Sequence, residues 1–138
     1  MKNPKENSLR WLRQAEFDLN EPVRAFEQGS FAYAAFFAEQ AAQKSLKAFL
    51  IAQGERWVMI HSVGELVKKA AAIQPAFKPL IDAGKKLDRH YLASRYPDAL
   101  PEPAIPAESY SADEAKEARA AAQEIFRQCQ QSIDLGNP

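Results

Sequence analysis

The residues of this chain best suited to bind a phosphate group lie in one short stretch, residues 89–98. Basic and aromatic side chains alternate there and end in the tetrapeptide Arg95-Tyr96-Pro97-Asp98. Arginine offers a planar fork of donors that matches phosphate, and tyrosine offers a surface on which a base can stack. The stretch therefore predicts an anion or nucleotide pocket. Its candidate residues are Arg89, Arg95, Tyr96 and Asp98.

The same stretch also has a purely structural interpretation. The basic residues at positions 85, 86 and 89 can form a solvated helix face, with Asp82 and Asp88 as charge partners. A helix end followed by a turn accounts for residues 96–98, but it does not account for Arg95. Arg95 is therefore the residue on which the predicted pocket depends.

Three further residues are candidates for phosphate binding, each with a structural alternative. Lys44 and Lys47 lie on an otherwise apolar segment. Each either reaches a phosphate or, as we slightly favour, extends along the edge of the bundle into water. His61 precedes Ser62 and either belongs to a site or only marks the entrance of a helix, which is the commoner role of a lone histidine.

Several kinds of catalytic and metal site are excluded by residue type and spacing. The chain has two histidines, His61 and His90, and one cysteine, Cys129, so no zinc site with Cys/His spacing can form. No glutamate has a histidine three residues later, as a di-metal carboxylate site in a helical bundle requires. Gly29-Ser30 is not followed by the Asp-x-Asp pair of small nucleotidyltransferases, because alanine and glutamine occupy positions 41 and 43. We therefore expect no catalytic residue, no metal and no cofactor.

Helices must position these residues, because no segment shows the alternation of a strand. Apolar spacings of three, four and seven predict a first helix from Leu9 to Phe26, with a kink or break near Asn20 caused by Pro22. A second, very apolar helix follows Gly29-Ser30 and ends at Gly54. Its many alanines allow neighbouring helices to approach closely, which predicts a central position.

The second half of the chain predicts three more helices. Capping boxes of the S-x-x-E type open one helix at Ser62 and another at Ser111; the first stops at Pro75 and the second is closed by Gly136. Between them a helix runs from about Pro79 to Tyr96, with a weak point at Gly84. The four prolines between residues 97 and 110 predict an extended loop without regular structure.

Length and composition fit one domain over residues 1–138. The chain is 46% hydrophobic, and its 18 basic and 18 acidic residues cancel, so no global field draws it to nucleic acid or to an anionic membrane. A charged amino terminus and the absence of any apolar run near ~20 residues predict a cytoplasmic protein with no membrane association. We predict an all-α, up-and-down antiparallel bundle of about five helices. The aromatic residues Trp11, Phe31, Phe36 and Trp57 exceed what one small core encloses and favour a patch that a second copy or a partner covers.

Taken in order, these residues resemble the HEPN family (higher eukaryotes and prokaryotes nucleotide-binding) over nearly the whole chain. The matching segments are Trp11–Leu19 (W-L-R-Q-A-E-F-D-L), Phe37–Leu50 (F-A-E-Q-A-A-Q-K-S-L-K-A-F-L), His61-Ser62 and Ser94–Asp98. The resemblance implies a helical bundle that dimerises and that is often encoded beside a minimal nucleotidyltransferase, for which it would be the substrate-binding-subunit-like partner. It also implies, for many members, a role as a toxin or as its neutralising antitoxin partner.

The resemblance adds a ribonuclease hypothesis from which this sequence departs. Ribonuclease members carry an arginine followed, after four to six residues, by a histidine. The permitted positions hold leucine, proline and glutamate after Arg95, and serine, arginine and tyrosine after Arg89. Without that histidine no general acid or base near neutral pH is evident.

We therefore expect a homodimeric module that binds a nucleotide or a nucleotidyltransferase partner rather than an enzyme. Two alternatives stay open. One is a metal-independent ribonuclease that uses Arg95 with His61 or His90, and the other is a purely structural protein-interaction bundle.

Overall fold

Helices form the whole architecture of residues 3–135, the part of the chain that this computed structural model describes. No strand occurs among these residues, which confirms the predicted all-α bundle, and the predicted end of the last helix at Gly136 lies outside them. The elements are α1 (Pro4–Glu27), α2 (Phe31–Ala52), α3 (Val63–Ile73), the 3₁₀ helix η1 (Pro75–Leu80), α4 (Ile81–Asp88), α5 (His90–Ala93), the 3₁₀ helix η2 (Pro97–Ala99), α6 (Pro106–Ser109) and α7 (Ala112–Leu135).

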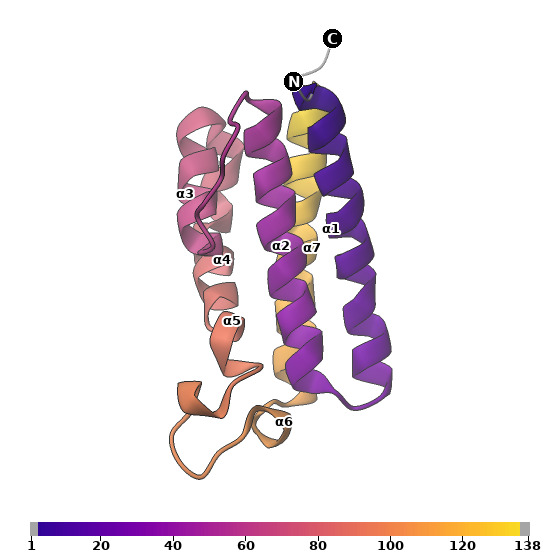
Figure 1. Ribbon diagram of the computed structural model, residues 1–138, viewed down its shortest axis with the longest axis vertical. Coiled ribbons are helices and arrows are strands. Elements are labelled where there is room, and N and C mark those ends of the chain that lie inside the picture. Colours follow the sequence, from indigo (N-terminus) through magenta and orange to yellow (C-terminus); the bar gives the residue numbers. More distant parts are fainter. Residues whose placement is uncertain (1–2, 136–138) are drawn as a thin grey trace.

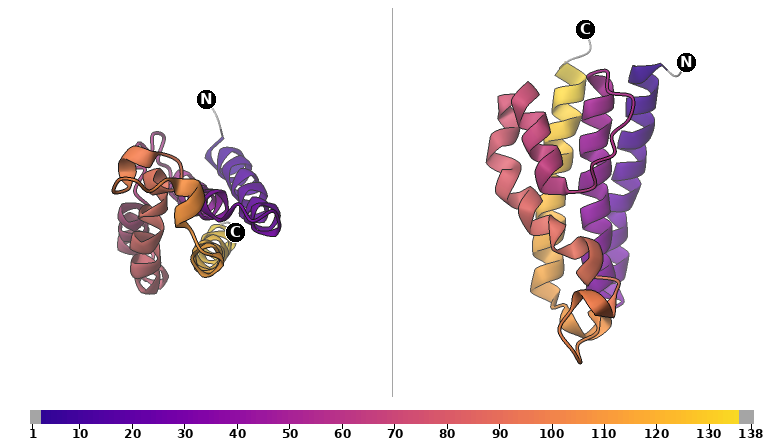
Figure 2. Two further views of the ribbon diagram at one scale, coloured as in Figure 1. Left: turned by 90° about the horizontal axis from the view of Figure 1, so that it is seen from below. Right: turned by 60° about the vertical axis from the view of Figure 1, so that its left-hand side comes forward.

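The central element is α2, with α1 and α7 packed along it and the shorter helices on its other side (Figures 1 and 2). Its alanines bring these neighbours close, since their small side chains leave little between the backbones. The fully buried alanines of α2 are Ala35, Ala38, Ala41, Ala42 and Ala48. Larger side chains, such as Leu46 and Phe49, fill the remaining core. The predicted central position of this helix is confirmed.

Of the two alternatives predicted near Asn20, the break is wrong, because α1 continues through Pro22 as one helix, and the kink stays a prediction. A proline inside a helix removes one hydrogen bond and crowds the preceding turn. Pro22 is fully buried in this bundle, and its packing against the core offsets that loss. Local sequence shows the loss of the hydrogen bond but not the packing that compensates for it.

The predicted fourth helix is divided into η1, α4 and α5, so the chain bends at Arg89. Gly84 is a point of close approach between α3 and α4 and not a weak point. A β-carbon added at Gly84 would lie 3.0 Å from Cγ2 of Val67 and 3.1 Å from Cα of Gly64. Only glycine therefore lets these two helices pack so closely.

Ser62 and Ser111 both cap the helices that they were predicted to open, since Ser62 Oγ accepts a hydrogen bond from the Glu65 amide and Ser111 Oγ accepts one from the Glu114 amide. The reciprocal bond of a capping box forms at Ser111, whose amide donates to Glu114, whereas the carboxylate of Glu65 pairs with Lys68. The proline-rich loop, residues 97–110, contains two short helical pieces, η2 and α6, where no regular structure was predicted. It projects at the end of the bundle opposite the chain termini (Figure 1). Within residues 3–135 no helix combines the length and hydrophobicity needed to cross a membrane.

Candidate functional site

Arg95 follows α5, and its guanidinium group is held among three aromatic rings. Its Nε and Nη2 donate to the carbonyl oxygen of Tyr91 at 3.0 and 2.8 Å. The guanidinium carbon lies 4.5 Å from the ring centre of Phe36, 5.0 Å from that of Tyr91 and 4.8 Å from that of Tyr96. No carboxylate of residues 3–135 forms an ion pair with Arg95. The positive charge is therefore fixed in place by cation–π contacts and a carbonyl group, without being neutralised.

A cavity of about 350 Å³ opens beside Arg95, beneath the proline-rich loop. One wall is the start of α2, from Ser30 to Tyr33, and the opposite wall comes from the loop at Pro97 and Pro106. Ser30 occupies the N-cap position but makes no capping hydrogen bond with its side chain, and the first turn of α2 contains no acidic residue. The first amide groups of a helix have no partner within it and favour negative charge. The cavity thus offers a cation, polar amide groups and the exposed ring of Tyr33, in a volume typical of ligand pockets.

A buried polar stripe runs along α2 away from this cavity. Glu39, Gln43 and Lys47 are spaced four residues apart, and all three are buried within the most apolar helix of the chain. Gln43 connects the other two, because its Nε2 donates to Glu39 Oε2 at 3.0 Å while its Oε1 accepts from Lys47 Nζ at 3.1 Å. The stripe is therefore one connected network.

Within this network, Glu39 is the residue whose acid–base behaviour is changed most by folding. Burial raises its pKa to about 7, although hydrogen bonds from Gln40 and Gln43 oppose the shift; Asp88 adds to it and Arg95 opposes it. Sequence analysis missed Glu39 and Gln43. Polar residues at i, i+4 and i+8 in an alanine-rich helix were the signal that could have found them.

His61 links the α2 network to the arginine site. Its Nδ1 lies 3.3 Å from Gln43 Oε1 and 3.5 Å from Lys47 Nζ, and its ring stacks on Tyr91 with centres 6.3 Å apart and planes 8° apart. Tyr91 is the residue whose carbonyl holds Arg95. The structure therefore connects Lys47 to Arg95 through His61 and Tyr91, whereas the sequence offered Lys47, His61 and Arg95 only as separate candidates. His61 also occupies the position before the N-cap Ser62, as predicted.

The structural interpretation of the sequence makes Asp88 a charge partner of the basic helix face, but the carboxylate of Asp88 has other partners in the structure. Its carboxylate accepts hydrogen bonds from Ser62 Oγ at 2.7 Å and from the amides of Val63 and Gly64 at 2.6 and 3.1 Å. Asp88 therefore caps α3 from α4 and fixes the segment that carries His61.

Lys44 lies apart from Arg95, on the side of α2 that faces α1. Its Nζ forms an ion pair at 2.5 Å with Asp18, a buried carboxylate that also accepts a hydrogen bond from Gln14 Nε2 at 3.1 Å. The charge of Lys44 is thus paired with a carboxylate of the bundle itself. Lys47 is buried and does not extend freely to water.

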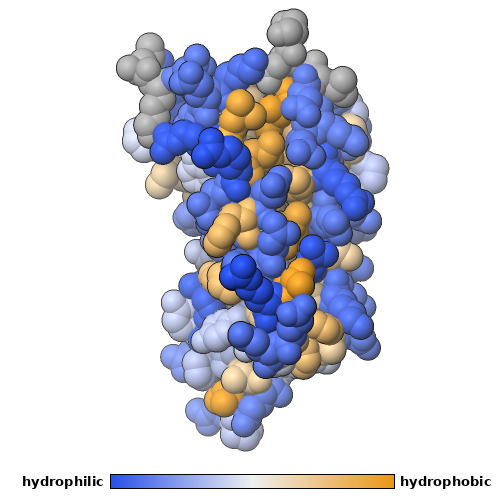
Figure 3. Space-filling view, turned by 90° about the vertical axis from the view of Figure 1, so that its right-hand side faces the viewer, coloured by the Kyte–Doolittle hydropathy of each residue, from blue (hydrophilic) through white to orange (hydrophobic). Residues whose placement is uncertain are grey.

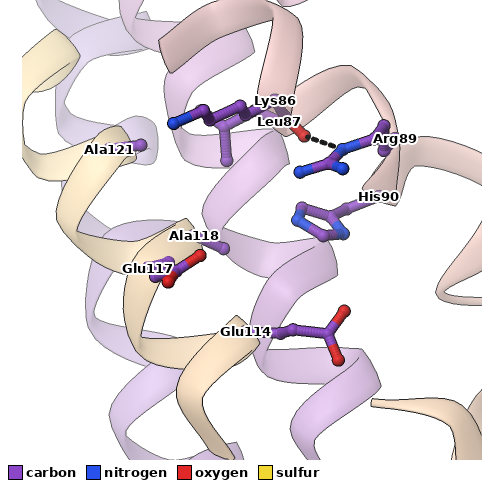
Figure 4. A pocket seen from close by; sticks show the side chains of 8 residues that line it. All are labelled: Lys86, Leu87, Arg89, His90, Glu114, Glu117, Ala118 and Ala121. Carbon is purple, nitrogen blue, oxygen red and sulfur yellow. Dashed lines mark hydrogen bonds between the residues drawn. The ribbon is translucent and has the colours of Figure 1, made fainter. Parts of the chain in front are cut away.

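Arg89 and His90 belong to a second, smaller pocket between α4, α5 and α7 (Figure 4). Its volume of about 50 Å³ is too small for a nucleotide. Arg89 Nε lies 3.5 Å from the carbonyl oxygen of Lys86, and His90 Nδ1 lies 2.9 Å from the Tyr110 hydroxyl. Burial, reinforced by Arg89, lowers the pKa of His90, and burial raises the pKa of Tyr110 to about 12. The His90–Tyr110 pair is therefore a hydrogen bond between two neutral side chains.

The remaining candidates lie at the edge of the site. Tyr96 is 51% exposed and contacts Arg95 through its ring, and Asp98 lies in exposed η2, beyond the cavity lining. Within residues 3–135, no group of three or more His, Cys, Asp or Glu side chains is arranged to hold a metal ion.

The chain is similar to known proteins over most of its length. The family model that matches is the HEPN domain, over residues 8–132. Among solved structures, the protein TT1696 from Thermus thermophilus has 33% identity and a TM-score of 0.83, covering 91% of this chain and 97% of its own. The archaeal HEPN homologue ST0689 has 32% identity and a TM-score of 0.74, covering 96% and 99%. An HEPN domain protein from Thermotoga maritima has 28% identity and a TM-score of 0.68, covering 88% and 95%. No curated protein matches the chain significantly.

Proposed function

Because this chain belongs to the HEPN family, we propose that it is a nucleotide-binding accessory module whose ligand occupies the cavity beneath the proline-rich loop. The observation that carries the proposal is Arg95, a guanidinium group that borders the cavity and has no carboxylate partner within residues 3–135. The surrounding aromatic rings and the two hydrogen bonds to Tyr91 preorganise the guanidinium group. Binding of a phosphate therefore costs little conformational entropy at this side chain.

The chemistry of the cavity matches a nucleotide in two respects. A phosphate group would receive charge-assisted hydrogen bonds from Arg95 and would face the amide groups at the start of α2. A base would stack on the exposed ring of Tyr33, which also lines the cavity. We assign no bond-breaking step to the module alone.

Calorimetric titration of the purified protein with ATP, GTP and short RNA tests this proposal. Arg95→Ala should weaken binding by about 10- to 100-fold, the loss expected for one hydrogen-bonded charge. Arg89→Ala is the matched control, since it removes the same charge from the surface near the small pocket and should leave the affinity unchanged. Absence of binding by the wild type, or equal binding by Arg95→Ala, would contradict the proposal.

We further propose that the module acts as a homodimer with a minimal nucleotidyltransferase, in a toxin–antitoxin pair. Incomplete burial of the aromatic residues supports a protein partner: Trp57 is 83% exposed, and Trp11, Phe31 and Phe36 are half-buried. Affinity purification from the native organism should recover a small nucleotidyltransferase. Its recovery without any nucleotide binding by this chain would favour a purely structural interaction bundle.

A metal-independent ribonuclease remains the second candidate, and one observation favours its His61 form over its His90 form. His61 stacks on the tyrosine that holds Arg95, whereas His90 contacts Tyr110 beside the small pocket. This function predicts RNA cleavage in EDTA that His61→Ala abolishes and His90→Ala preserves. Absence of cleavage by the wild type would exclude it.

A further inference from the structure

An open groove of about 670 Å³ runs along the amino-terminal half of α1, away from the Arg95 cavity. Three cations line it, Arg10 and Arg13 from α1 and Lys44 from α2, together with the rings of Trp11 and Phe17. Its lining contains no carboxylate. Phe17 is 60% exposed, although the flank on which α1 lies is mostly hydrophilic, with apolar residues in a narrow band (Figure 3). Lys44 is paired with Asp18, but Arg10 and Arg13 form no ion pair within residues 3–135.

The proline-rich loop has the complementary chemistry. Residues 97–114 contain five carboxylates and neither lysine nor arginine. The tip of the loop, Pro101-Glu102-Pro103, is exposed on all three residues and is not part of the Arg95 cavity lining, which uses Pro97 and residues 105–107. The tip forms a tight turn, in which the Ala104 amide donates to the carbonyl oxygen of Pro101 at 2.9 Å. An acidic tip therefore complements a basic groove in charge, and its prolines offer apolar surface to the aromatic rings of the groove.

The tip cannot reach the groove of its own chain. The loop projects at the end of the bundle opposite the termini, and the groove lies toward the amino end of α1 (Figure 1). The helix between Phe17 and Glu27 alone spans about 15 Å. Two antiparallel copies related by a two-fold axis would instead place each tip at the groove of the other and make the contact twice.

We propose that the loop tip of one copy binds in the α1 groove of a second copy. This inference rests on the proposed homodimer and names the surfaces that form it. Because the contact pairs exposed charges, association weakens as salt rises. Glu102 of the tip and Glu108 of the neighbouring helix α6 supply the acidic side, and Arg10 and Arg13 supply the basic side.

Sedimentation velocity with charge-reversed variants tests the contact. Arg10→Glu/Arg13→Glu and Glu102→Lys/Glu108→Lys should each raise the dimer dissociation constant at least about tenfold. An equimolar mixture of the two variants should associate again, because the reversed groove of one variant then meets the reversed tip of the other, and the native groove meets the native tip. Arg127→Glu and Glu124→Lys, at exposed positions on α7, are the matched controls and should dimerise normally.

The possible failures are distinguishable. A wild-type monomer would overturn both this contact and the proposed homodimer. A dimer that resists both reversals and high salt, or a mixture that stays monomeric, would overturn the contact alone. Circular dichroism checks that each variant is folded, and titration with nucleotide tests the Arg95 cavity separately, since none of the substituted residues lines it.

Discussion

Glu39 shows at the residue scale how burial gives a side chain properties that its sequence position does not reveal. In the unfolded chain its pKa lies near 4.5, and in the bundle it is about 7. The folded state therefore keeps a proton that the unfolded state releases as the pH rises between these values. Its stabilising effect is complete below pH 4.5 and is lost as the pH passes 7.

Glu39→Gln should remove this pH dependence, because glutamine fits the same space without titrating. Relative to the variant, the wild type should lose on the order of 3 kcal/mol of unfolding free energy between pH 4.5 and 8. Urea denaturation at several pH values measures the free energy of unfolding of both proteins. The difference between the two proteins is free of the contribution of His90, which is common to both and has the opposite sign because its pKa is lowered. Parallel pH profiles for the two proteins would show that Glu39 titrates normally.

The sequence could identify Arg95 but not its surroundings. A helix end and a turn explain the residues around Arg95 without requiring a guanidinium group, so its presence indicated a site. The contacts of Arg95 with Phe36 on α2, by contrast, connect residues far apart in the chain. The same holds for His61 on Tyr91, and only the folded bundle shows these two pairs.

At the element scale, features that depend on a few neighbouring residues were predictable, and features that depend on packing were not. The serine caps at Ser62 and Ser111 each depend on four consecutive residues and are confirmed. The continuity of α1 through Pro22 and the division of the fourth helix at Arg89 depend on contacts with other helices. No local pattern carries that information.

Asp88 gives α3 a second cap that comes from another helix. Asp88→Ala leaves the amides of Val63 and Gly64 without their acceptor and should lower the free energy of unfolding by about 2–3 kcal/mol. Chemical denaturation measures the loss. Asp82→Ala removes a carboxylate from an exposed position of α4 and should change stability by less than about 0.5 kcal/mol. Equal effects of the two substitutions would show that general charge, and not the cap, is responsible.

At the scale of the whole molecule, Cys129 reports whether the bundle opens as a unit. It is the only cysteine in the chain, lies fully buried on α7 in the main core, and burial raises the pKa of its thiol well above the ordinary value. A thiol reagent should therefore modify it only when the core opens. Modification of the native protein at the rate of the urea-unfolded chain would show that α7 detaches separately.

The same thiol connects ligand binding to the stability of the entire fold. A nucleotide that binds only the folded state, present at 100 times its dissociation constant, should slow Cys129 modification by about 100-fold when reclosing outpaces the reaction. Arg95→Ala, with its 10- to 100-fold weaker binding, should reduce this protection to about 2- to 10-fold at the same nucleotide concentration, and Arg89→Ala should retain it in full. Undiminished protection in Arg95→Ala would place the ligand elsewhere on the bundle, because Cys129 responds to global opening wherever the nucleotide binds.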